Sequence, residues 1–255
     1  MKTVVLLTGT ISPNTNHVVH RNTEERRKEY LDAIRYYSTI CPVFFIENSN
    51  YEINSDKEFM SLDNVVIQQY EPDLNSDHTI GYQEFDMIDK WMDEQQDDIR
   101  VIKVSGRYKI DNFLKVYEEC QISSAEMIID VWTLSNWAIT YVFCTTVSAY
   151  KKMFMGKYRY CNKYVDIEEI FCKIIRSDEN VNITFFKNIP EVNVKTAGSG
   201  KVLSSHESVI SSIILRPINR WVYPKLIIYP NFKSFKENLL RKMVKILKSV
   251  KEKVI

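Results

Sequence analysis

Glycine is scarce in this 255-residue chain, and long apolar runs and paired cysteines are absent. With six glycines and no GxGxxG after the first predicted strand, a dinucleotide or methyl-donor cofactor in a Rossmann cradle is disfavoured. No run of about 18 apolar residues occurs, so no segment is expected to span a bilayer. The five cysteines are widely spaced and form no CxxC pair, which is typical of a reducing compartment and predicts a cytoplasmic protein.

Other familiar motifs are missing as well. The stretch Gly198-Ser199-Gly200-Lys201 lacks the earlier glycine and the following Ser or Thr of a Walker phosphate loop. There is no HExxH among the four histidines and no GxSxG nucleophile elbow. These absences disfavour P-loop nucleotide hydrolysis, zinc proteases and α/β-hydrolases.

Charge is balanced overall but not along the chain. The formal net charge is +1, whereas nucleic-acid-binding domains are normally strongly basic, so a generic nucleic-acid binder is disfavoured. Residues 231–255 alone carry a net charge of +6, which leaves −5 for residues 1–230. The composition, 45% hydrophobic and 26% charged, is that of an ordinary folded domain.

Apolar runs of strand length alternate with helix-like segments along residues 1–190, which predicts an α/β fold with a mainly parallel sheet. The expected strands are 4–8, 41–46, 65–67, 99–104, 127–132, 139–145 and 181–186. The expected helices are 23–37, 81–93, 112–119, 147–155, 166–175 and, in the basic tail, 238–250. Residues 191–212 are predicted to form a mobile surface loop. We therefore expect one domain over 1–230 followed by a basic amphipathic helix within 231–255.

Short polar side chains follow the first two predicted strands. Thr8-Gly9-Thr10 follows the first strand and Glu47-Asn48-Ser49 follows the second. Because ligands bind at the carboxyl edge of open α/β sheets, these two segments are expected to lie side by side in a binding site. The alternative is that they serve only as turn residues.

A basic bend follows the strand predicted at 99–104. Lys103 precedes Ser105 and Gly106, and Arg107 follows them, so two cations and a backbone N–H are expected near one anionic ligand. Arginine offers a planar fork and lysine a point charge, a combination suited to a diphosphate leaving group. The alternative is that Arg107 pairs with a surface carboxylate such as Glu84 or Asp86.

Five short segments in order resemble a known family. They are Leu7-Thr8-Gly9-Thr10-Ile11, residues 26–30, Phe45-Ile46-Glu47-Asn48-Ser49, Gly81-Tyr82-Gln83-Glu84 and Lys103-Val104-Ser105-Gly106-Arg107-Tyr108. Over residues 4–112 this set resembles bacterial glycosyltransferases of capsule and lipopolysaccharide O-antigen gene clusters. Those proteins carry Lys-Gly before Tyr-Gly-Glu, where this chain reads Thr79-Ile80-Gly81-Tyr82-Gln83-Glu84. The lysine is missing here, so a phosphate role for it is not carried over.

The resemblance implies a GT-A-like, Rossmann-like fold and a nucleotide-sugar donor, with UDP-hexose expected. It implies donor contacts from the strand-end segments, from Gly81, Tyr82 and Glu84, and from the basic bend with Lys103, Ser105, Gly106 and Arg107. Such enzymes usually hold Mn²⁺ or Mg²⁺ on an Asp-x-Asp, but Ser105-Gly106-Arg107 stands in that place. We therefore expect metal-independent transfer in which Arg107 and Lys103 supply the positive charge, without excluding either metal.

An inverting transferase also needs a carboxylate that takes the proton of the acceptor hydroxyl. The candidates are Asp130, after an apolar strand, and Glu168 and Glu169, at the start of the helix predicted from Asp166. The alternative for the two glutamates is that they only compensate the helix dipole.

The basic tail predicts contact with an anionic membrane. Apolar residues recur every three or four positions in 238–250, with cations on the other faces, a pattern typical of a helix lying on a bilayer. Together these features predict a peripheral enzyme on the inner face of the cell membrane. It would transfer sugar to a lipid-linked or cell-surface glycan. The rival interpretation is a non-catalytic membrane-surface α/β module that binds a nucleotide or an anionic glycan, and the alternative for the tail is a helix packed on the domain.

Overall fold

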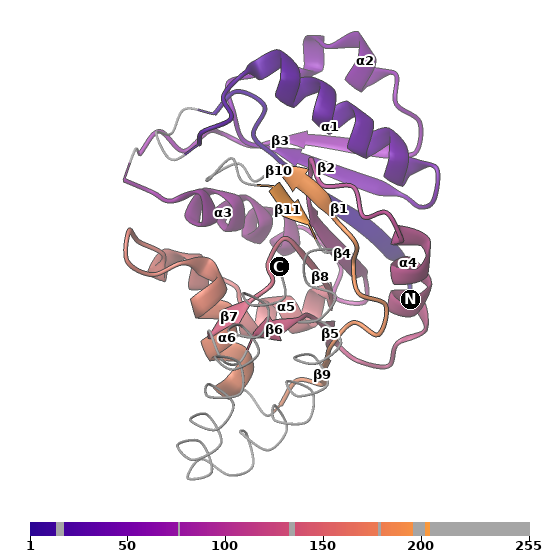
Figure 1. Ribbon diagram of the computed structural model, residues 1–255, viewed down its shortest axis with the longest axis vertical. Coiled ribbons are helices and arrows are strands. Elements are labelled where there is room, and N and C mark those ends of the chain that lie inside the picture. Colours follow the sequence, from indigo (N-terminus) through magenta and orange to yellow (C-terminus); the bar gives the residue numbers. More distant parts are fainter. Residues whose placement is uncertain (14–17, 76, 133–135, 178–179, 196–201, 205–255) are drawn as a thin grey trace, which may run out of the picture.

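A computed structural model describes residues 1–13, 18–75, 77–132, 136–177, 180–195 and 202–204 (Figure 1). Seven strands form the main sheet: β1 Thr3–Gly9, β2 Val43–Glu47, β3 Val65–Gln69, β4 Arg100–Ser105, β5 Met127–Ile128, β8 Val142–Thr146 and β9 Ile183–Thr184. Two small pairs stand apart from it: β6 Val131–Trp132 with β7 Trp137–Ala138, and β10 Asn193–Lys195 with β11 Val202–Ser204. The helices are α1 Thr23–Ser38, α2 Lys57–Met60, α3 Ile80–Asp93, α4 Phe113–Ile122, α5 Val147–Met153 and α6 Ile167–Ser177, with 3₁₀ turns η1 Ile53–Ser55 and η2 Lys157–Tyr160.

The main sheet is mixed but mainly parallel. Its strand order is β3-β2-β1-β4-β8-β5-β9. Strand β8 runs antiparallel to both of its neighbours, β4 and β5, whereas the other pairs are parallel. This arrangement confirms the predicted fold class, an α/β fold with a mixed, mainly parallel sheet flanked by helices.

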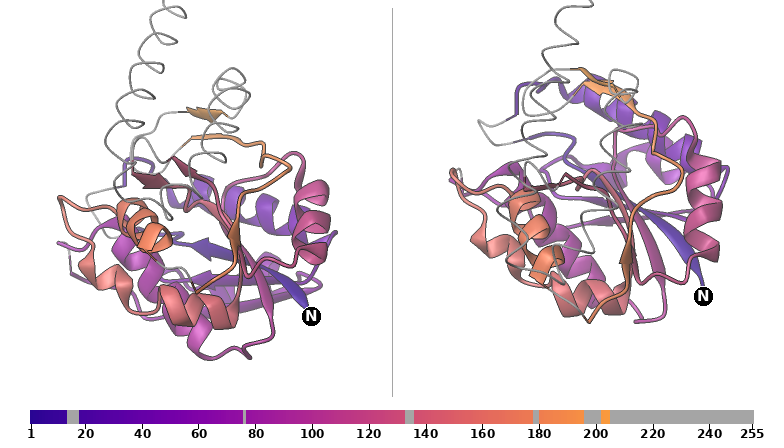
Figure 2. Two further views of the ribbon diagram at one scale, coloured as in Figure 1. Left: turned by 90° about the horizontal axis from the view of Figure 1, so that it is seen from below. Right: turned by 60° about the horizontal axis from the view of Figure 1, so that its bottom comes forward.

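Helices cover both faces of the sheet (Figures 1 and 2). Strand β1 shows why, because every one of its residues is buried and alternate side chains point to opposite faces. Val5 and Leu7 pack in the core beneath α1 and α4, while Val4 and Leu6 pack in the core beneath α3, α5 and α6. The continuous apolar run that predicted this strand thus reflects burial on both sides.

Polar caps fix where the two long helices begin. The Asn22 side chain accepts a hydrogen bond from the Glu25 N–H at 3.1 Å, so α1 begins at Thr23, as expected. The Thr79 hydroxyl accepts from the Tyr82 N–H at 3.2 Å, so α3 begins at Ile80. This second cap places the start of α3 beside the carboxyl edge of β1.

The second half of the chain departs from the predicted elements. The strand predicted over 127–132 divides into β5 and β6, and that over 139–145 shortens to β8, with β7 before it. The bond from the Ile139 N–H to the Asp130 carbonyl, 2.8 Å long, closes the base of the β6–β7 hairpin where the predicted strands were expected to continue. Part of the loop predicted over 191–212 is instead the β10–β11 hairpin. Helices α2, η1 and η2 were not predicted.

The basic helix predicted over 238–250, and the domain boundary predicted near 230, lie outside the described residues. None of the helices in the described part of the chain combines the length and apolar character that crossing a bilayer requires.

Candidate functional site

The strand ends singled out by the sequence meet at one edge of the sheet. Gly9 pairs in register with Glu47, and Thr8 pairs with Ser105. The expectation that the first two strand ends lie side by side is therefore confirmed. This carboxyl edge is also approached by the first turns of α3 and α6, because an added Cβ on Gly81 would lie 3.0 Å from the Ile167 side chain.

Residues at the end of β2 form hydrogen bonds with the loop that follows β1. Glu47 is wholly buried, and its carboxylate accepts the Ile11 N–H at 2.9 Å and, in addition, the Ser49 N–H and hydroxyl. The Ser49 oxygen in turn accepts the Ser12 N–H at 3.0 Å. Burial raises the pKa of Glu47, and these donors partly offset the rise. Donor binding by Glu47 stays a prediction, and the structure shows its carboxylate enclosed and hydrogen-bonded within the protein.

Thr10 and Asn48 complete this loop. The Thr10 hydroxyl donates to the Asn48 side-chain oxygen at 2.7 Å, and the Thr10 N–H donates to the Tyr30 hydroxyl at 3.0 Å. The buried Arg26 guanidinium donates to the Thr10 carbonyl. Donor binding by Thr8, Gly9, Thr10, Asn48 and Ser49 stays a prediction, and the structure gives them a defined local role, which is to fix the backbone of residues 9–12.

A buried lysine organises the centre of the edge. The Lys103 side chain is fully enclosed, and its ammonium lies 2.7 Å from the Glu84 carboxylate and 2.9 Å from the Thr140 carbonyl. Glu84 also accepts the Thr8 hydroxyl at 2.5 Å. Contact of Lys103 with a ligand phosphate stays a prediction, and in the structure this buried cation is paired with a carboxylate.

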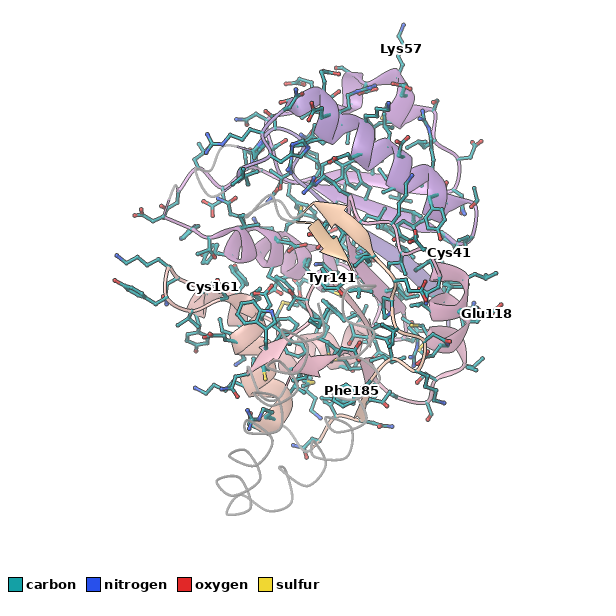
Figure 3. The ribbon with its side chains drawn as sticks, viewed as in Figure 1. Cys41, Lys57, Glu118, Tyr141, Cys161 and Phe185 are labelled. Atoms are coloured by element: carbon teal, nitrogen blue, oxygen red, sulfur yellow. The ribbon has the colours of Figure 1, made fainter. Side chains whose placement is uncertain are left out.

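The same network reaches one of the candidate catalytic carboxylates. The Thr140 hydroxyl donates to the Glu168 carboxylate at 2.8 Å, and Thr140 is also the residue whose carbonyl binds Lys103. We call the connected side chains the edge network: Thr8, Glu84, Lys103, Ser105, Thr140 and Glu168. Figure 3 places Tyr141, the next residue after Thr140, near the middle of the molecule.

Glu168 is one of the two carboxylates of the edge network. It lies in the first turn of α6 and is only partly exposed. Burial raises the pKa of its carboxyl group, the hydrogen bond from Thr140 opposes the rise, and the negative charge of Glu84 adds to it. A carboxylate with a raised pKa in a polar edge of a sheet has the character of a general base.

The other two candidate carboxylates are placed differently. Asp130 is buried at the same edge, between β5 and β6, and its carbonyl accepts the Ile139 N–H. Glu169 is exposed, because consecutive residues of a helix point about 100° apart. Catalysis by Asp130 or Glu169 stays a prediction, and partial burial and the hydrogen bond from Thr140 distinguish Glu168 from Glu169.

Arg107 and Lys103 contact different helices. Its guanidinium donates to the Glu29 carboxylate of α1 at 2.6 Å, whereas the Lys103 ammonium lies 5.4 Å from the centre of the Phe85 ring of α3. Convergence of the two cations on one anion stays a prediction. The alternative, that Arg107 pairs with a surface carboxylate, is confirmed, with Glu29 as the partner instead of Glu84 or Asp86. The charges of Arg107, Glu84 and Glu168 all act on Tyr108, whose pKa burial raises to about 12, so the Arg107 charge still acts near the edge network.

Gly106 lets two strand ends approach closely. Its N–H donates to the Thr8 carbonyl at 2.9 Å, and an added Cβ would lie 2.5 Å from that same backbone oxygen. Gly9 is similarly enclosed, with an added Cβ 2.4 Å from the Phe45 ring. In the sequence, both glycines therefore marked positions where a side chain would not fit.

We expect Gly106→Ala to lower the free energy of unfolding by about 3 kcal/mol, near the upper end of overpacking losses, because the Thr8 carbonyl is backbone and cannot rotate away. Gly156→Ala is the control. It has open space around it but a φ of 76°, so it should cost only about 1 kcal/mol. Urea unfolding measures both. Equal losses would show that the close approach at Gly106 does not determine its effect.

Gly81 and Tyr82 support the start of α3. Gly81 packs against Ile167, which brings the first turns of α3 and α6 together. The Tyr82 ring stacks on His78, with ring centres 3.7 Å apart, and meets Tyr158 edge-on. Donor binding by Gly81, Tyr82, Ser105 and Gly106 stays a prediction.

The donor set does not fit the divalent metal that GT-A-like enzymes usually hold. The residues after β4 offer a hydroxyl and a guanidinium, and the nearby Glu84 carboxylate is paired with Lys103. In the described residues, no group of three or more His, Cys, Asp and Glu is placed to hold a metal ion. No catalytic step is therefore derived through a metal.

No protein-family model matches the sequence, and no curated protein matches it. Among solved structures, the chain resembles a galactosyltransferase in complex with donor and acceptor sugar analogues, with 8% identity, a TM-score of 0.45 and coverage of 71% of this chain and 72% of the other. It also resembles CMP:2-keto-3-deoxy-manno-octonic acid synthetase, with 8% identity, a TM-score of 0.43 and coverage of 85% and 100%. A Francisella tularensis 2-C-methyl-D-erythritol 4-phosphate cytidylyltransferase matches with 11% identity, a TM-score of 0.38 and coverage of 84% and 99%. Likenesses this distant carry no argument about activity, which therefore depends on the chemistry of the site.

Sequence reasoning missed several residues of the site. Thr140 precedes an antiparallel strand, and no motif marks such a position. Tyr108 lies next to the basic bend, and the charges that act on it are known only from the fold. Arg26 and Tyr30 fall within the segment 26–30 that carried part of the family resemblance, and their contacts with Thr10 give that segment a physical role.

Proposed function

We propose that this chain is an inverting glycosyltransferase that moves a sugar from a nucleotide-sugar donor to a hydroxyl of a glycan acceptor. The observation that carries the proposal is Glu168, a partly buried carboxylate with a raised pKa, hydrogen-bonded at the carboxyl edge of a mainly parallel sheet. Ligand sites of open α/β folds lie at this edge. A nucleotide sugar bound there would present its anomeric carbon to an acceptor that Glu168 deprotonates.

The chemistry needs one proton transfer and one displacement. The acceptor hydroxyl gives its proton to the Glu168 carboxylate while its oxygen bonds to the anomeric carbon, and the bond from that carbon to the nucleoside diphosphate breaks. The Thr140 hydroxyl orients the Glu168 carboxylate. The Lys103 ammonium holds Thr140 in place by donating to the Thr140 carbonyl. Arg107 is placed to offset the charge of the leaving diphosphate once Glu29, whose side chain is 41% exposed, releases it.

The identity of the donor, the acceptor and the biosynthetic role is proposed from the family resemblance. We propose a UDP-hexose donor, a lipid-linked or cell-surface glycan acceptor, and a role in capsule or O-antigen polysaccharide synthesis at the inner face of the membrane. These proposals depend on the ordered motifs of residues 4–112 and on the charge of the tail.

Release of UDP separates this proposal from its rival. The full-length protein is incubated with UDP-, GDP-, dTDP- and CMP-sugars, with and without a glycan acceptor and with and without Mn²⁺, and nucleotide release and melting temperature are followed. A transferase should be stabilised by one donor class, since a bound ligand stabilises the native state by mass action, and should release its nucleotide faster with acceptor. Stabilisation without release would instead identify a binding module. Dependence on Mn²⁺ would contradict the metal-independent form of the proposal.

We expect kcat/KM for transfer to fall as the pH is lowered through the pKa of Glu168, because the base must be ionised. That pKa is raised, so the acid limb should lie above the value of about 4.3 for an ordinary glutamate. Thr140→Val removes a hydrogen bond that favours the ionised form, so it should move the limb to higher pH. An acid limb that stays in place in Thr140→Val would contradict the assignment of the base.

A further inference from the structure

A short segment before α6 combines positive charge with tyrosine. We call residues 157–164 the basic aromatic turn; its sequence is Lys-Tyr-Arg-Tyr-Cys-Asn-Lys-Tyr. It contains three cations, three tyrosines and no acid, and the next acid along the chain is Asp166. In Figure 1 this segment protrudes from the body of the molecule before it enters α6.

The base of the turn is anchored to α3. Tyr158 is buried, its hydroxyl donates to the Asp86 carboxylate at 2.6 Å, and its ring meets the Tyr82 ring edge-on at 4.9 Å. Cys161 is buried as well. These contacts hold the turn in one position relative to the edge network.

The tip of the turn is a closed loop. The Asn162 and Val165 backbones bond to each other in both directions, at 3.1 and 3.2 Å, and the Asn162 side chain accepts the Tyr164 N–H at 2.9 Å. Lys163 and Tyr164 therefore stand at a fixed tip, where the Lys163 ammonium lies 4.9 Å from the centre of the Tyr164 ring. The segment is thus ordered without burying its outer side chains.

Those outer side chains face solvent. Tyr160 is 65% exposed and Tyr164 is 80% exposed, although large aromatic side chains are usually buried. None of the ion pairs in the described part of the chain involves Lys157, Arg159 or Lys163. An ordered, protruding surface with exposed tyrosines and cations outside ion pairs is complementary to an anionic partner with an apolar component.

We propose that the basic aromatic turn contacts an anionic lipid bilayer. Tyrosine rings settle at the boundary between headgroups and acyl chains, because one end is apolar and the other is polar. Lysine and arginine beside them are attracted by anionic headgroups. A protruding tip meets a broad surface more readily than it encloses a small ligand, which favours a bilayer over a soluble anion.

This contact would also orient the site. Val165 and Asp166 alone separate Tyr164 from α6, whose first turn carries Glu168. This inference rests on the proposed function. It puts the candidate base, Glu168, next to the bilayer surface from which a lipid-linked acceptor would arrive. The bilayer contact itself is measured without donor or acceptor, so its failure is distinct from a failure of the proposed transfer reaction.

The cysteines of the chain make a site-specific probe practical. All five are buried, so a cysteine introduced at the surface is selectively labelled. Full-length Tyr164→Cys and Glu118→Cys are each labelled with the polarity-sensitive fluorophore NBD. Glu118 is exposed on α4, and Figure 3 shows it near the margin opposite Cys161. The labelled proteins are mixed with vesicles of phosphatidylcholine alone or with phosphatidylglycerol.

With the anionic vesicles, the label at position 164 should gain intensity and shift to the blue, and the label at 118 should not change. Arg159→Gln/Lys163→Gln should lower vesicle partitioning about 25-fold, since each cation near an anionic surface contributes about fivefold. Lys109→Gln/Lys115→Gln, which removes two exposed lysines elsewhere, should change it much less. If the protein sediments with the vesicles while the label at 164 stays in water, the tail alone binds and the proposal is wrong. An equal response to neutral vesicles would also overturn it.

Discussion

Glu168→Gln is expected to lower the rate of sugar transfer by about 10²- to 10⁴-fold, the range that a general base contributes. The amide keeps the shape of the side chain and an oxygen that accepts the Thr140 hydroxyl, but it cannot take the acceptor proton. Donor binding should remain, so the donor should raise the melting temperature of the variant as it does that of the parent. Transfer is measured as acceptor-dependent release of the nucleotide.

Glu169→Gln is the matched control. It removes the same charge from the same helical turn, but Glu169 faces solvent, so transfer should change little. Similar losses in both variants would indicate that the negative charge at the start of α6 matters and that Glu168 is not the base. Full activity in Glu168→Gln would direct attention to Asp130, the buried carboxylate at the same edge.

Glu84→Ala is expected to lower the free energy of unfolding by about 3–5 kcal/mol, the typical cost of leaving one partner of a buried ion pair. Lys103 has no exposed surface, and without Glu84 its ammonium keeps the Thr140 carbonyl and the Ser105 hydroxyl but no counter-charge. Urea unfolding at neutral pH measures the loss.

The double variant Lys103→Met/Glu84→Gln tests the cause. Removing the buried charge together with its partner should restore much of the lost stability, because a neutral pair leaves no unpaired ion in the interior. If the double variant were as unstable as Glu84→Ala, packing around these residues, and not the charge, would determine the effect. Lys151→Met/Asp97→Asn serves as a comparison, since that pair lies at the surface and such pairs are worth about 0–1 kcal/mol.

The first half of the fold could be predicted because its signals are local. Strand β1 is a continuous apolar run, and α1 and α3 each begin after a side chain that caps the helix. The second half could not be divided correctly, because β5, β6 and β7 are two residues long. In such short strands tertiary pairing, and not the period of hydrophobicity, decides where each element ends.

The candidate site was predicted in part. The sequence placed Glu168 at the start of a helix, but only the orientation of α6 distinguishes it from Glu169. The burial of Lys103 could not be predicted, because lysine is rarely enclosed without a partner and its partner Glu84 comes from α3, far along the sequence. Alternation along β4 sends Lys103 toward α3, and Arg107, beyond the end of the strand, turns toward α1.

The single reversed strand in the sheet has a consequence for how such a site can diversify. Because β8 runs against its neighbours, the chain leaves the carboxyl edge after β5 and returns to the same edge before β8. The hydrogen bond between the Ile139 N–H and the Asp130 carbonyl closes the base of this connection. Residues inserted or deleted beyond that bond would therefore leave the strand pairing of the main sheet unchanged. A different hairpin can therefore be grafted at this point while the strand pairing of the main sheet stays the same.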